Sequence, residues 1–133
     1  MEREQNLVDR LEAMLRGGGY EVHREVRLLT RYIDLVARAP HGGTVLAVEA
    51  KVRNWREGLR QALVYRLAAD RVFLAVSSQY AHRVNHDLLR SYGIGLITVD
   101  GQAHIVMSAG DSEVIHKSLR EQLMSEISRR KEV

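Results

Sequence analysis

Two carboxylates and one lysine occur at spacings that would bring them together on a β-hairpin. Asp34 lies in a run with strand character, 32–39, and Glu49 lies in a second such run, 44–52. The four residues between the runs, Pro-His-Gly-Gly, are typical of a turn. If the turn is centred on the middle of this tetrapeptide, the numbers of paired residues sum to 83. Asp34 is then directly opposite Glu49, with both side chains on one face.

This arrangement predicts a cation site. Like charges that face each other across a β-ladder are destabilising. They become favourable when a hard cation lies between them, and Mg²⁺ binds through one or two carboxylates together with water and phosphate oxygens. Lys51 lies two residues beyond Glu49 and therefore projects from the same face. The alternative is a cluster of Asp, Lys and Glu salt bridges at an exposed hairpin end.

The residues around these charges are apolar. On the face of Glu49 the strand carries Val45 and Ala47, and Leu46 and Val48 lie on the other face. Both faces are therefore expected to be covered, so that the charged groups are partly buried. A buried charge is costly unless it is paired or bound to a metal.

The elements that position these residues follow from hydrophobic periodicity. A leucine stripe predicts an amphipathic first helix, which Gly17-Gly18-Gly19 would end. The expected strands are 20–28, 32–39, 44–52, 71–76 and 94–99, with 103–107 as an optional last strand, and the expected helices are 2–16, 55–69, 79–92 and about 112–130. This order predicts an α/β domain, a mixed sheet with helices on both faces.

The composition and charge of the chain exclude several classes of function. The chain of 133 residues has no cysteine, which excludes disulfides, cysteine-ligated zinc and a thiol nucleophile. No apolar run is long enough to span a membrane, and a cytoplasmic location is expected. The net charge of +3 is concentrated, because residues 51–90 hold eight basic and three acidic side chains. Most basic residues are arginine, which suits phosphate contact, although a genomic bias would also explain this.

The pattern of Asp34 followed by Glu49-Ala50-Lys51 in a hairpin, then a helix and an apolar strand, resembles the PD-(D/E)xK nuclease superfamily. The resemblance covers roughly residues 2–99 and implies a restriction-endonuclease-like fold. The motif is short, and its position in the second and third strands is what makes it specific. One departure is Ile33, where the family name has proline.

Two further features resemble branches of this superfamily. Gln61 and Tyr65 lie four residues apart on the next helix, as in the cleft-lining motif of the RecB-like branch, although an ordinary polar position beside a core tyrosine explains them too. Holliday-junction-resolvase-like members supply a glutamate from the first helix. Glu4 is the candidate here, Glu12 competes with it, and a solvated helix face would account for either.

The resemblance implies roles for these residues. Asp34, Glu49 and the Ala50 carbonyl would hold Mg²⁺, with Mn²⁺ as a substitute, and Lys51 would position the attacking hydroxide or stabilise the transition state. Gln61 would contact the scissile phosphate or metal-bound water. The expected nucleic-acid contacts are Arg53, Arg56, Arg60 and Tyr65.

The expected function is therefore a metal-dependent nuclease that hydrolyses phosphodiester bonds, with DNA as the expected substrate. The alternatives are a non-catalytic nucleic-acid-binding module with the same fold, and a small structural protein whose hairpin charges form salt bridges. Residues 1–110 would form the nuclease-like core. The helix within 111–133 would belong to the same domain or mediate a homodimer through an apolar stripe formed by Ile115, Leu119, Leu123 and Ile127.

Overall fold

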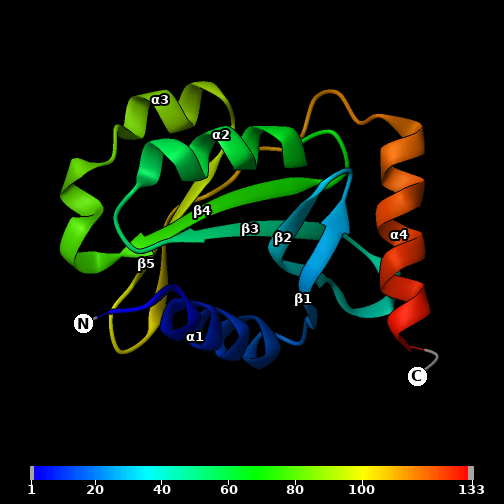
Figure 1. Ribbon diagram of the computed structural model, residues 1–133, viewed down its shortest axis with the longest axis horizontal. Coiled ribbons are helices and arrows are strands. Elements are labelled where there is room, and N and C mark those ends of the chain that lie inside the picture. Colours follow the sequence, from blue (N-terminus) through cyan, green and yellow to red (C-terminus); the bar gives the residue numbers. More distant parts are fainter. Residues whose placement is uncertain (1, 132–133) are drawn as a thin grey trace.

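The computed structural model describes residues 2–131, which form a mixed six-stranded sheet with helices on both sides (Figure 1). The strands are β1 (Glu21–Leu28), β2 (Arg31–Arg38), β3 (Val45–Lys51), β4 (Arg71–Ser77), β5 (Gly95–Val99) and β6 (Ala103–Met107). The helices are α1 (Glu4–Gly17), α2 (Trp55–Tyr65), α3 (His86–Ser91) and α4 (Lys117–Lys131), with 3₁₀ segments η1 (Pro40–Gly42) and η2 (Ser78–Arg83). The expected fold class is confirmed. Within residues 2–131 no helix combines the length and apolar character needed to cross a membrane.

The strands lie side by side in their chain order. β1, β2 and β3 are antiparallel neighbours, β3, β4 and β5 are parallel, and β6 is antiparallel to β5. Parallel neighbours need a crossover connection. α2 supplies it between β3 and β4, and η2 with α3 supplies it between β4 and β5.

Two apolar layers cover the sheet. On one face α1 buries Leu7, Leu11 and Leu15, which is the stripe that the sequence predicts. The glycines after it end the helix as expected, with Gly19 in the left-handed region at φ 88°. The other face is covered by α2, α3 and α4 (Figure 1).

Part-way along the β1–β2 hairpin, the side chains change the face of the sheet on which they pack. Val22 packs on the α1 side and Val26 on the opposite side, although strict alternation would place them on one face. Between them Glu25 has a positive φ of 49°. Asp34 lies opposite Glu25, because the flanking pairs are Arg24 with Leu35 and Val26 with Ile33. The twist therefore occurs at Asp34.

Two sequence expectations are wrong. The helix expected over 79–92 is divided into η2 and α3, because the backbone is extended at Val84 and Asn85 and Asn85 caps α3 through its side chain. The last helix begins at Lys117 rather than near 112. Asp111 and Ser112, near the expected start, lie before the helix and bind other partners. Asp111 forms an ion pair with Arg71, and the Ser112 hydroxyl donates to the Ala69 carbonyl.

The apolar stripe of α4 is used within the chain. Leu123 and Ile127 are fully buried in the core cluster of the α2 side, and Leu119 packs against that cluster. Ile115 lies before the helix and is partly exposed. The stripe therefore covers the sheet, and the surface expected for a homodimer is not available on this face of α4.

Candidate active site

The hairpin register brings the two predicted carboxylates together. Leu35 pairs with Val48 and Arg38 with Val45, which is the register predicted from the turn. Asp34 and Glu49 are the next residues along β2 and β3, at the point where the ladder ends. There the Ala50 N–H donates to Asp34 Oδ2 at 2.8 Å. The carboxylate thus replaces a backbone acceptor, which fixes Asp34 against β3.

Glu49 is buried, with 4% of its surface exposed. The Tyr65 hydroxyl of α2 donates to its Oε1 at 2.6 Å. Burial, and then the adjacent Asp34 carboxyl, raise the pKa of Glu49 to about 8. Burial also raises the pKa of Asp34, against the hydrogen bond from Ala50, which lowers it. Without a cation, this pair therefore holds a proton near neutral pH.

Lys51 lies between two helices at the end of β3. Its Nζ is 3.8 Å from Glu4 Oε1 on α1 and 3.6 Å from Glu57 Oε1 on α2. The side chain is largely buried, and these ion pairs hold its ammonium group at the strand end. The structure thus brings Glu4 to the predicted site. Glu12 instead forms ion pairs with two arginines on the surface.

Gly58 allows α2 to approach Lys51. A Cβ at this position would lie 2.9 Å from Lys51 Cγ and 2.6 Å from Leu74 Cδ1. Contacts this short require the helix or the lysine to move. Gly58 thus sets the position of Lys51, a role that the sequence pattern did not indicate.

We expect Gly58→Ala to displace Lys51 or α2. Overpacking of this kind costs about 1–3 kcal/mol of stability. The measurement is urea denaturation of the purified variant beside Gly101→Ala, because a Cβ at Gly101 would meet nothing within 4 Å. Equal stability of the two variants would contradict the proposed contact.

The other two residues predicted on α2 differ in their surroundings. Gln61 Oε1 is buried and has no hydrogen-bond partner among the described residues. An unpaired buried oxygen is unusual in a native protein. Tyr65 is 1% exposed and contacts Glu49 through its hydroxyl. It is thus a contact of Glu49 within the fold, which differs from the expected contact with nucleic acid.

The predicted basic surface is exposed beside this site. Arg53, Arg56 and Arg60 lie at the surface in the loop after β3 and on α2. None of the three forms an ion pair with a residue of the described part of the chain, and Arg56 lies over the Trp55 ring at 4.5 Å. Eight of the other arginines form ion pairs with carboxylates, namely Arg10, Arg16, Arg24, Arg38, Arg71, Arg90, Arg120 and Arg129.

The donor set fits a hard divalent cation. Asp34 and Glu49 would supply carboxylate oxygens, and the Ala50 carbonyl is next to Glu49 in the chain. Residues 2–131 contain no cluster of three or more His, Asp or Glu side chains suited to bind a metal. Mg²⁺ needs only one or two carboxylates and keeps several waters. A bound cation would also replace the proton shared by the two carboxylates.

An open pocket adjoins Asp34 on the α1 side. Glu4, Arg24, Glu25 and Asp34 line it. Glu25 was not predicted as a site residue, because its position opposite Asp34 depends on the twist of the hairpin. Arg130 of α4 donates to the backbone carbonyl of Glu25 at 2.6 Å and also to that of Arg24, and so holds this twisted segment.

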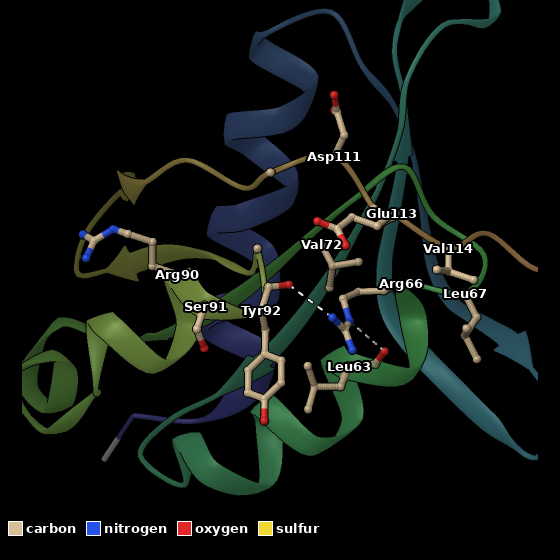
Figure 2. A pocket seen from close by; sticks show the side chains of 13 residues that line it. Leu63, Arg66, Leu67, Val72, Arg90, Ser91, Tyr92, Asp111, Glu113 and Val114 are labelled. Carbon is tan, nitrogen blue, oxygen red and sulfur yellow. Dashed lines mark hydrogen bonds between the residues drawn. The ribbon is translucent and has the colours of Figure 1, made fainter.

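A separate pocket of about 440 Å³ lies at the opposite end of β4, where Val72 lines it (Figure 2). Arg66 donates there to the carbonyls of Leu63 and Tyr92 and lies over the Tyr92 ring. None of the predicted site residues lines this pocket.

The comparisons with known proteins establish the fold. No family model matches the sequence, and no curated protein matches it. The architecture is that of an α/β fold also found in a nuclease. A repair endonuclease from Pyrococcus abyssi has a TM-score of 0.55 at 16% identity, over 75% of this chain and 48% of that one. A protein of unknown function from Silicibacter pomeroyi has a TM-score of 0.72 at 21% identity, over 98% of this chain and 89% of that one.

Proposed function

We propose that this protein is a metal-dependent nuclease of the PD-(D/E)xK superfamily that hydrolyses phosphodiester bonds of nucleic acid, with DNA as the substrate. The observation that carries the proposal is the convergence of Asp34, Glu49 and Lys51 at the point where the pairing of β2 with β3 ends. The fold shared with a repair endonuclease supports it.

Each residue of the candidate site would have a separate role in catalysis. Asp34, Glu49 and the Ala50 carbonyl would hold Mg²⁺, which supplies a water of lowered pKa and neutralises charge on the phosphate. Tyr65 orients Glu49 through its hydroxyl. Lys51 presents its ammonium to the phosphate or to the attacking water, where a fixed positive charge stabilises the transition state. Gln61 offers its unpaired oxygen to a water in the site.

The test is a cleavage assay on plasmid, single-stranded and four-way-junction DNA and on RNA, with Mn²⁺ and with Mg²⁺. We expect cleavage with either metal and none in EDTA. Binding without cleavage on every substrate would favour a non-catalytic nucleic-acid-binding module instead. Neither binding nor cleavage would refute both.

The exposed arginines predict a salt-dependent interaction. Replacing Arg53, Arg56 and Arg60 together by alanine should weaken binding to nucleic acid of any sequence. The slope of log K against log salt should become shallower by about two units, because each phosphate contact contributes about 0.7–0.9. Fluorescence anisotropy across a salt series measures both quantities.

The matched control replaces Arg71, Arg90 and Arg129, which carry the same total charge but have carboxylate partners elsewhere on the surface. We expect this triple variant to change the slope less. Identical slopes for the wild type and the Arg53, Arg56 and Arg60 variant would refute the proposed binding surface.

The homodimer stays a prediction. Two symmetric active sites would serve cleavage of two strands. Because the stripe of α4 is buried within the chain, the contact would use another surface. Sedimentation of the full chain at micromolar concentration is the measurement, with a dimer as the expected result. A monomer at that concentration would refute the dimer.

A further inference from the structure

An exposed aromatic side chain lies beside the proposed catalytic carboxylate. Tyr32 on β2 is 59% exposed, whereas Ile33 after it is fully buried. Asp34 follows Ile33, so this buried residue separates Tyr32 from Asp34 along the strand. Residues two apart on a strand lie about 7 Å from each other. Nothing in the chemistry of the two carboxylates requires an aromatic ring at this position.

Basic side chains flank this tyrosine. Arg27 is the cross-strand partner of Tyr32 and is exposed. It forms no ion pair within residues 2–131. Arg31 precedes Tyr32, so its side chain points to the other face of the strand, where it lines an opening together with Glu57 and Arg60 of α2. The ring therefore lies across the ladder from an exposed arginine, Arg27, that no carboxylate of the described residues neutralises.

The backbone that carries the ring is fixed. The Tyr65 hydroxyl, which donates to Glu49, also lies 3.5 Å from the Tyr32 carbonyl. The buried Ile33 side chain anchors the next residue in the core. The aromatic ring is thus solvent-exposed, while its main-chain carbonyl lies near the hydroxyl that donates to Glu49. An exposed aromatic face beside an unpaired arginine has the chemistry of a stacking platform for nucleobases.

We propose that Tyr32 stacks on the base of an unpaired nucleotide beside the scissile phosphate. The substrate of the site is then single-stranded nucleic acid, or a single-stranded segment of a larger molecule. Base faces within a duplex are covered by their neighbours, whereas an unpaired base offers a face to an aromatic side chain. Arg27 and Arg31 contact the adjoining phosphates. This inference rests on the proposed nuclease function.

The experiment compares Tyr32→Ala with Tyr32→Trp, which keeps an aromatic face. Leu29→Ala is the matched control, because Leu29 is another exposed apolar residue of the same hairpin, at 45% exposure. Binding of a labelled single strand and of the corresponding duplex is measured by fluorescence anisotropy in EDTA, and cleavage of both is measured with Mn²⁺. We expect Tyr32→Ala to weaken binding to the single strand by about 5- to 100-fold. Duplex binding should change little, and Tyr32→Trp and Leu29→Ala should behave like the wild type.

A series of single strands, each with one abasic position, locates the stacked base. One position should weaken binding by the wild type but not by Tyr32→Ala, since the ring and the base act as a pair. Unchanged single-strand binding and cleavage by Tyr32→Ala, with an active wild type, would overturn the stacking proposal and leave the nuclease function standing. A wild type that neither binds nor cleaves any nucleic acid would overturn both.

Discussion

Replacing Asp34 by asparagine will reduce cleavage by at least about a hundred- to thousandfold and will leave the fold intact. The carboxylate is needed for its charge, whereas the amide oxygen can still accept the hydrogen bond from the Ala50 N–H. Because burial raises the pKa of Asp34, the neutral side chain also removes a desolvation cost. The metal-free variant should therefore be at least as stable as the wild type. Single-turnover cleavage with Mn²⁺ and thermal melting measure the two effects.

Alanine at Asp34, Glu49 or Lys51 should abolish cleavage as well. Asp34→Asn is the sharper variant because it separates loss of charge from loss of packing. Undiminished activity of purified Glu49→Ala protein, or cleavage by the wild type in excess EDTA, would refute the assignment of the site.

The second prediction with a large effect concerns the free energy of unfolding, which we expect to depend on pH and on bound metal. The pKa of Glu49 is about 8 in the folded chain and 4.5 in its ordinary state. The folded state therefore binds a proton more tightly than the unfolded state does. The resulting stabilisation is fully present below pH 4.5 and is lost as the pH rises towards 8, where ionised Glu49 destabilises the metal-free fold. The loss amounts to a few kcal/mol, at about 1.4 kcal/mol for each unit of pKa shift.

Denaturation in metal-free buffer at pH 5 and pH 8 measures this loss, with Glu49→Gln as the control. The glutamine can still accept a hydrogen bond from Tyr65 but does not ionise, so its stability should depend less on pH and exceed that of the wild type at pH 8. Mg²⁺ at a hundred times its dissociation constant should stabilise the wild type by about 3 kcal/mol. It should stabilise Glu49→Gln much less. A wild type that responds to neither pH nor Mg²⁺ would contradict the paired-carboxylate site.

The central part of the site could be predicted from the sequence because it depends on local geometry. A short turn fixes the register of a hairpin, and the register fixes which side chains are opposed. Asp34 and Glu49 could therefore be paired without knowledge of the rest of the fold. Lys51 followed from the alternation of side chains along the same strand.

The remaining site residues depend on tertiary contacts that periodicity does not encode. Gly58 matters because α2 crosses Lys51 closely, and Tyr65 is buried because its hydroxyl reaches Glu49. Glu25 gains its place opposite Asp34 from the pairing of β1 with β2. The start of α4 was misplaced for a related reason, since Asp111 and Ser112 bind partners about 40 residues away in place of capping a helix.

The contacts of α4 with the β1–β2 hairpin have a consequence for folding. Arg130 reaches the Glu25 carbonyl across a sequence separation of 105 residues, and Leu123 and Ile127 complete the core over the same strands. Contacts this distant in sequence raise the contact order of the domain, which slows folding. The bonds from Arg130 to the Arg24 and Glu25 carbonyls can form only after α4 has been synthesised. A chain that ends before α4 would therefore lack the contacts that hold the Glu25 segment opposite Asp34.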